Sequence, residues 1–91
     1  MTLSELCRAA VDKFGIQAQT RKAVEELTEL SLALQHSEKG KTSYENICEE
    51  IVDCRIMLDQ LEIMYDRNGF IEKWSVIKKK NLEKLVSSKQ V

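Results

Sequence analysis

Two pairs of carboxylates stand at helical spacing in the first sixty residues of this chain. Glu26 and Glu29 are three residues apart, and so are Glu50 and Asp53. Residues three apart on an α-helix lie on one side of it. Two such helices packed face to face would bring four carboxylates into one acidic pocket, where a divalent cation could neutralise their charge.

The chemistry of such a pocket follows from its ligand type. Carboxylate oxygens suit Mg²⁺ or Mn²⁺, which keep several waters, and disfavour zinc. A metal held in this way fits phosphate chemistry, because the ion can bridge phosphate oxygens and activate a water. The chain has no Gly-rich phosphate loop and no Ser or Cys paired with a His, so we do not expect covalent catalysis. His36 has no partner at ligand spacing and is interpreted as a surface residue.

Each pair also has a simpler interpretation, an acidic face in contact with water. The third helix argues against it, because Glu50 and Asp53 fall within or beside an apolar face that includes Ile51, Cys54 and Met57. Carboxylates turned toward a core are costly unless a counter-charge neutralises them. The spacing therefore favours a metal site over a solvated surface.

The elements that must position these residues are helices. The chain has no proline, and three glycines divide it into segments of helix-compatible composition. Capping-box patterns begin at Thr2 and at Thr42. We predict one all-α domain over residues 1–91, with its core over about 3–86 and a polar tail from Ser87. The predicted helices span residues 3–14, 16–37, 43–67 and 70–86.

Two apolar patterns predict how the helices pack. On the second helix the inward stripe is expected to be Ile16, Ala23, Val24, Leu27, Leu30 and Leu34. The third helix carries a second apolar line, Val52, Ile56 and Ile63, on the side away from its main apolar face. Because 91 residues bury little surface alone, we expect a second copy to cover this line. The alternative is a central helix buried within one chain.

Composition limits the partners and the compartment. With 14 basic and 15 acidic residues, the overall charge argues for neither a nucleic acid nor a membrane surface. No apolar run approaches the roughly 20 residues of a membrane span. The three cysteines lack metal-site spacing and lie among apolar residues, which predicts reduced thiols and a cytoplasmic protein.

Taken in order, these residues resemble the signature of the MazG-like, all-α nucleoside triphosphate pyrophosphohydrolase superfamily. That superfamily has an EExxE helix followed by an ExxD helix. The matching stretches here are Gln19-x-x-Lys22-x-x-Glu25-Glu26-x-x-Glu29 and, after a gap of 20 residues, Glu50-x-x-Asp53. Lys80-Asn81-x-x-Lys84 resembles the family's lysine and asparagine cluster near the C-terminus. The resemblance extends from about Phe14 to Leu85.

The resemblance implies a four-helix MazG-like bundle, assembled as a homodimer or tetramer with sites near subunit contacts. Its implied activity is Mg²⁺-dependent hydrolysis of a nucleoside triphosphate, with a dNTP as first choice, to the monophosphate and pyrophosphate. Mn²⁺ is the alternative cofactor. The resemblance also assigns roles: metal ligation to Glu26, Glu29, Glu50 and Asp53, general base or further ligand to Glu25, and phosphate binding to Lys22, Lys80, Asn81 and Lys84.

Two other functions stay open. One is a non-catalytic helical oligomer, such as a small phage-type interaction protein, which would not need all four carboxylates to meet. The other is a phosphoribosyl-ATP pyrophosphohydrolase, although that related family has a Tyr-His pair where this chain has Cys54-Arg55-Ile56-Met57. Trp74 and Phe70 are the available surfaces for stacking on a base, with a core or interface role as the alternative.

Overall fold

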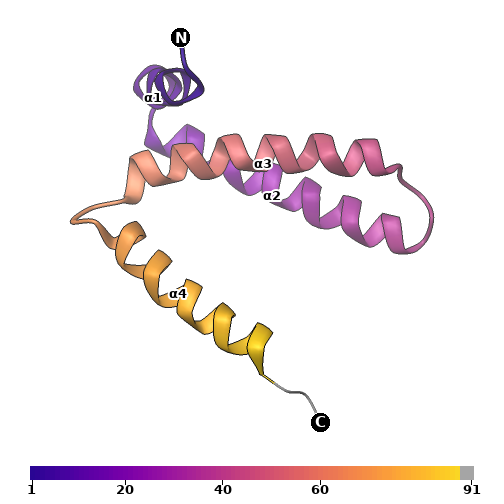
Figure 1. Ribbon diagram of the computed structural model, residues 1–91. Coiled ribbons are helices and arrows are strands. Elements are labelled where there is room, and N and C mark those ends of the chain that lie inside the picture. Colours follow the sequence, from indigo (N-terminus) through magenta and orange to yellow (C-terminus); the bar gives the residue numbers. More distant parts are fainter. Residues whose placement is uncertain (89–91) are drawn as a thin grey trace.

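A computed structural model describes residues 1–88 of the chain, and this part is all-helical, as predicted. No strand occurs among the described residues. Residues 89–91, which belong to the predicted domain and polar tail, lie outside them. The four helices, drawn in Figure 1, are α1 (Leu3–Phe14), α2 (Ile16–Glu38), α3 (Tyr44–Tyr65) and α4 (Phe70–Ser87).

The two expected capping boxes have different outcomes. At Thr2 the box is confirmed, because the Thr2 hydroxyl accepts the Glu5 N–H at 3.1 Å and the Glu5 carboxylate accepts the Thr2 N–H at 3.0 Å. At Thr42 the prediction is wrong: Ser43 is the N-cap of α3, and its Oγ accepts the Asn46 N–H at 3.1 Å. Thr42 and Ser43 could each serve as the N-cap, because both carry a hydroxyl. The capping-box pattern pairs the cap with a glutamate three residues later and so points to Thr42 with Glu45, but the helix uses Ser43.

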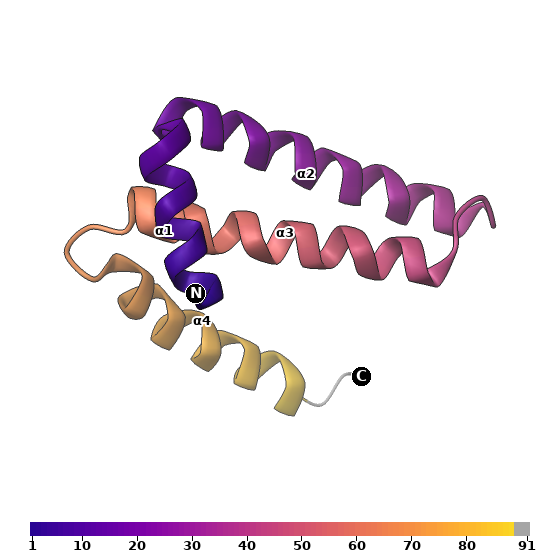
Figure 2. The ribbon, with the colours of Figure 1, turned by 90° about the horizontal axis from the view of Figure 1, so that it is seen from above.

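Helices α2 and α3 form an antiparallel hairpin that holds most of the core (Figure 2). Their buried apolar residues are small or flexible, which lets the two helices approach closely. Glu26 and Gln60 are buried in the same interface. The buried apolar side chains of the hairpin are Ala23, Ala33, Cys54, Met57 and Met64.

The predicted inward stripe of α2 is largely wrong. Val24, Leu27 and Leu34 are between 41% and 59% exposed, and Ile16 is also about half exposed. The side of α2 that packs on α3 is centred on the Ala23–Glu26–Ala33 line instead. The predicted stripe consists mostly of large aliphatic residues. A close helix–helix contact instead buries small side chains and leaves the larger ones outside the interface.

Helix α1 lies across α3, and the views of Figures 1 and 2 agree on this. The buried Cys7 thiol donates to the Ile56 carbonyl at 3.8 Å, and Ser4 lines a small cleft with Ile63. The side of α3 for which a second copy was expected is therefore partly covered by α1 of the same chain. Val52, at the far end of that line, remains 50% exposed.

Helix α4 extends away from the other three helices and buries none of its residues (Figure 1). It follows a tight turn in which Asn68 and Gly69 both adopt left-handed backbone conformations, with φ of 59° and 72°. The Asp66 carboxylate accepts the Ile71 N–H at 3.0 Å and so supports the first turn of the helix. None of the described helices combines the length and apolar character that crossing a membrane requires.

Candidate metal centre

The antiparallel α2–α3 hairpin brings three of the predicted metal ligands together. Glu26 and Glu29 on α2 and Glu50 on α3 each offer a carboxylate oxygen, and these oxygens all lie within 4.8 Å of one another. The helical spacing puts the first two on adjoining turns of α2, and the antiparallel packing puts the third opposite them. We call these three residues the carboxylate trio.

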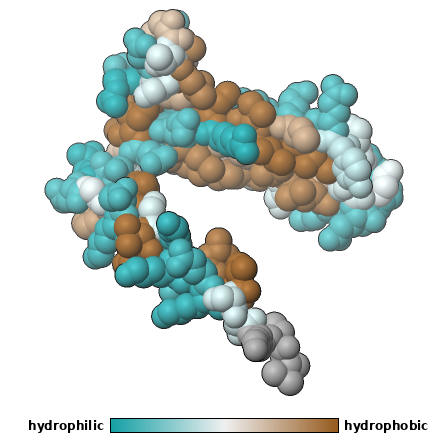
Figure 3. All heavy atoms as spheres, in the orientation of Figure 1, coloured by the Kyte–Doolittle hydropathy of each residue, from teal (hydrophilic) through white to brown (hydrophobic). Residues whose placement is uncertain are grey.

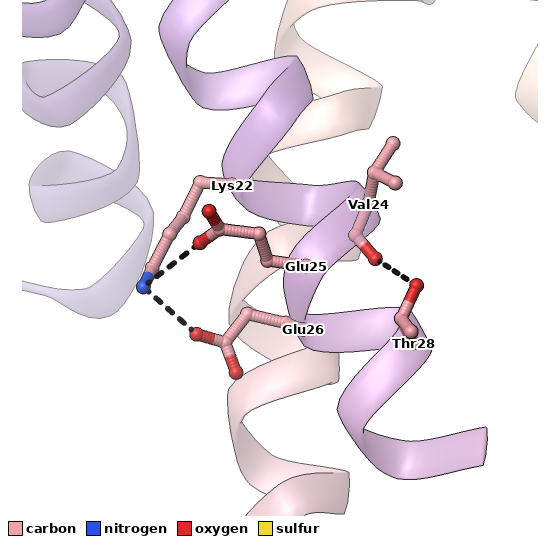
Figure 4. Close-up of polar contacts among 5 residues, drawn as sticks. All are labelled: Lys22, Val24, Glu25, Glu26 and Thr28. Atoms are coloured by element: carbon pink, nitrogen blue, oxygen red, sulfur yellow. Dashed lines mark hydrogen bonds and ion pairs between the residues drawn. The ribbon is translucent and has the colours of Figure 1, made fainter. Parts of the chain in front are cut away.

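Glu26 is the most buried member, with 8% of its surface exposed. One of its oxygens, Oε1, is 3.1 Å from the Lys22 ammonium, which also lies 3.6 Å from Oε2 of Glu25 (Figure 4). These contacts raise the pKa of Lys22, first through its hydrogen bond to Glu26 and then through the negative charges of Glu26 and Glu25. The second Glu26 oxygen, Oε2, is buried with no hydrogen-bond partner.

Glu50 also keeps one buried oxygen, Oε2, without a partner. Burial raises the pKa of the Glu50 carboxyl, and the charges of Glu29, Asp53 and Glu26 raise it further. Leaving a buried polar atom unpaired costs about 1–3 kcal/mol. Glu26 and Glu50 therefore each have a buried oxygen that a cation could satisfy.

Cys54 is buried next to Glu26 of the trio. Its thiol donates to the Glu26 carbonyl at 3.3 Å, and burial together with the surrounding carboxylates raises its pKa. A raised pKa keeps this thiol protonated and so makes it a poor nucleophile. Cys7, Cys48 and Cys54 are all free thiols, as the sequence predicted.

The other two predicted acidic residues lie at the edge of the trio. Asp53 is half-buried one turn after Glu50, close enough for its charge to raise the pKa of that carboxyl, but it is not one of the three converging groups. Glu25 is exposed and faces Lys22 (Figure 4). Its carboxylate therefore lies on the solvent side of the Lys22 ammonium, next to the buried Glu26.

The predicted phosphate-binding residues are divided. Lys22 lies in the site, whereas Lys80, Asn81 and Lys84 are exposed on α4. Because α4 extends away from the hairpin, a single chain does not bring these three residues to the carboxylate trio (Figure 1).

Sequence reasoning missed a pocket beside the trio. It has a volume of about 430 Å³ and is lined by Phe14, Arg21 and Met57, together with Lys22 and Glu25. Phe14 and Arg21 add an aromatic ring and a second cation to the lining of this pocket. Phe14 ends α1, one residue before the Gly15 turn, and no sequence pattern linked it to the acidic motif.

The donor set fits a hard divalent cation. All the converging atoms are carboxylate oxygens, which is the ligand chemistry of Mg²⁺ and Mn²⁺. Two of the three residues, Glu26 and Glu50, also have a buried oxygen with no hydrogen-bond partner. Comparison of the chain with protein-family models, curated proteins and solved structures finds no significant match.

Proposed function

We propose that this chain is a Mg²⁺-dependent nucleoside triphosphate pyrophosphohydrolase of the MazG-like kind. The observation that carries the proposal is the convergence of Glu26, Glu29 and Glu50, with two buried oxygens that no protein group satisfies. The resemblance of the EExxE and ExxD motifs supports the same activity, and a cytoplasmic location would suit it.

In this proposal the trio holds the metal ion and Asp53 completes its acidic surroundings. When bound, the ion supplies positive charge to the phosphate oxygens and lowers the pKa of a coordinated water. Glu25 accepts the proton of the water that attacks the α-phosphorus. The bond between the α-phosphorus and the bridging oxygen breaks, and pyrophosphate leaves with that oxygen.

Lys22 has two roles in the same scheme. In the structure its ammonium forms an ion pair with Glu26. A dication held by the trio would neutralise Glu26 in its place, which would leave Lys22 able to hold a phosphate oxygen. Arg21 lies beside it in the pocket, where Phe14 offers its ring to the nucleoside. Lys80, Asn81 and Lys84 could act only from the α4 of another copy.

The direct test is hydrolysis by the purified chain. Each dNTP and NTP is incubated with Mg²⁺ or Mn²⁺, and pyrophosphate and the monophosphate are both measured. We expect equal amounts of the two products from at least one substrate, none with EDTA, and loss of activity in Glu50→Gln. Glu49→Gln is the matched control, because Glu49 is exposed on the same helix. Release of inorganic phosphate instead of pyrophosphate would contradict the proposal.

The non-catalytic helical oligomer is the second candidate, and the Lys22–Glu26 ion pair favours it. That contact already neutralises the most buried carboxylate without any metal. Thermal melting separates the two functions: Mg²⁺ should raise the melting temperature of a metal enzyme and leave a scaffold unchanged.

A further inference from the structure

Lys22 already brings a positive charge to the carboxylate trio. Its Nζ atom lies 3.1 Å from Oε1 of Glu26, one turn further along α2, and 3.6 Å from Oε2 of Glu25 (Figure 4). The Glu26 side chain is 11% exposed, whereas the Lys22 side chain is 52% exposed. The ammonium therefore reaches a buried carboxylate from the solvent side, on a long side chain that has room to move.

Helix stability does not explain this ion pair. At a spacing of four residues, the order that stabilises an α-helix more has glutamate before lysine, and here the lysine comes first. Exposed pairs of this kind also contribute little to stability. What distinguishes the contact is its partner, because Glu26 is the most buried member of the trio. The contact is thus better explained by the trio than by the helix.

One ammonium satisfies only part of the trio. Oε2 of Glu26 and Oε2 of Glu50 remain buried without a hydrogen-bond partner while Lys22 is in place. The charge of Glu29 also acts on the ammonium and contributes to its raised pKa. Figure 3 shows apolar side chains bordering hydrophilic ones over the middle of the hairpin, a setting in which charges are screened less than in open water. Lys22 is therefore a partial counter-ion in a site that favours a larger positive charge.

A dication in the trio would compete with the ammonium. The carboxylate oxygens of the trio lie within 4.8 Å of one another, so an ion among them would stand close to the Lys22 ammonium on Glu26. Charges of the same sign at short range repel, and the ion would also cancel the negative charge that attracts Lys22. Metal binding should therefore weaken the contact between Lys22 and Glu26.

A released ammonium could act in the pocket beside the trio. Lys22 lines this pocket of about 430 Å³ together with its neighbour Arg21. Arg21 forms no ion pair with any residue that the structure describes. The pocket thus offers one uncommitted cation while Lys22 is held by Glu26, and two once Lys22 is released. Two adjacent cations suit a polyphosphate better than one.

We infer that Lys22 couples the binding of the metal to the binding of the nucleotide. In the empty site its ammonium stays on Glu26, which lowers the affinity for free Mg²⁺ and leaves the pocket one cation short. Metal and triphosphate together release it, so each ligand strengthens the binding of the other. The inference rests on the proposed function and adds to it that the site responds to metal and nucleotide together rather than to free metal.

The first test measures Mg²⁺ alone by isothermal titration. Lys22→Gln removes the competing ammonium and should bind Mg²⁺ about 5-fold or more tightly than the wild type does. Arg21→Gln is the matched control, because it removes a neighbouring positive charge from the same pocket that has no contact with Glu26. It should change the affinity by less than about 2-fold. Lys22→Arg keeps the charge and should resemble the wild type.

The second test measures the anion. With Mg²⁺ at saturation, inorganic pyrophosphate should bind about 10-fold more weakly to Lys22→Gln and to Arg21→Gln than to the wild type, because each variant has lost a charged donor. Lys22→Gln thus changes the two affinities in opposite directions, whereas Arg21→Gln changes only the second. A purely structural role of Lys22 would instead weaken both in Lys22→Gln.

A measurement on the wild type covers the case in which circular dichroism shows Lys22→Gln to be unfolded. The NMR signal of the Lys22 ammonium, assigned by its absence from Lys22→Arg, should move toward that of a solvated lysine as Mg²⁺ saturates the site. A signal that bound Mg²⁺ leaves unchanged overturns the inference, and so does a folded Lys22→Gln that binds Mg²⁺ no more tightly than the wild type. Both outcomes leave the metal site of the proposed function intact. Absence of Mg²⁺ binding to the wild type and to Lys22→Gln overturns the inference and the proposed function together.

Discussion

The α2–α3 hairpin and α4 are built from helices of similar length, but they differ in which residues they bury. The hairpin buries small apolar residues and a carboxylate, and leaves its larger aliphatic residues outside. Helix α4 has no buried residue and exposes most of its aromatic and aliphatic residues along one side. The hairpin therefore contains most of the core and the carboxylate trio, whereas α4 contributes no buried residue to either.

A core substitution should show the largest difference between the two regions. Met57 is 4% exposed between the hairpin helices, so Met57→Ala should lower the free energy of unfolding by about 2–5 kcal/mol. Val76→Ala, on the side of α4 away from its apolar line, should change it by less than about 0.5 kcal/mol. Urea unfolding followed by circular dichroism measures both. Equal effects would mean that α4 is as much a part of the core as the hairpin.

Replacing a carboxylate of the trio should weaken metal binding more than replacing one at its edge. Asp53→Asn, at the edge of the trio, should weaken Mg²⁺ binding about 10-fold, the loss expected for an outer partner of a ligand. Glu50→Gln removes one of the converging charges and should weaken it further. Isothermal titration with Mg²⁺ gives both affinities. If Asp53→Asn were the more damaging change, Asp53 would be a direct ligand and the trio would be incomplete.

The pH dependence of stability should reveal the free-energy cost of ionising Glu50 in the folded chain. Its folded pKa is raised, so the ionised form is disfavoured in the folded chain. Its contribution to stability is then full below the usual glutamate pKa and is lost as the pH rises through the raised value. In EDTA, unfolding free energies measured from about pH 4 to 8 should fall less with rising pH in Glu50→Gln than in the wild type. Saturating Mg²⁺ should remove most of this difference, because the dication favours the ionised carboxyl.

The same contrast explains what the sequence could and could not predict. The four helices were predictable because glycines and caps mark their ends, and the trio because helical spacing and antiparallel packing place Glu26, Glu29 and Glu50 together. The packing of α2 was not, because hydropathy favours large residues such as Leu27 whereas close contact favours Ala23. Periodicity also cannot tell whether an apolar side is covered by the same chain, as α1 covers part of α3, or is left uncovered, as on α4.

The smallest expected effects concern the N-termini of α3 and α4. Ser43 caps α3, a helix whose unfolding opens the core, so Ser43→Ala should lower the global free energy of unfolding by about 1 kcal/mol. Thr42→Ala is the control, because the Thr42 hydroxyl bonds a side chain and not the helix backbone.

Asp66 caps α4 in a comparable way, yet α4 buries no residue against the rest of the chain. Asp66→Ala should speed hydrogen exchange within α4 and leave the global free energy of unfolding unchanged. Measuring both quantities on both variants separates the regions, since a cap stabilises the whole molecule only when its helix is part of the cooperative core. A global loss in Asp66→Ala equal to that of Ser43→Ala would place α4 within the core of the single chain.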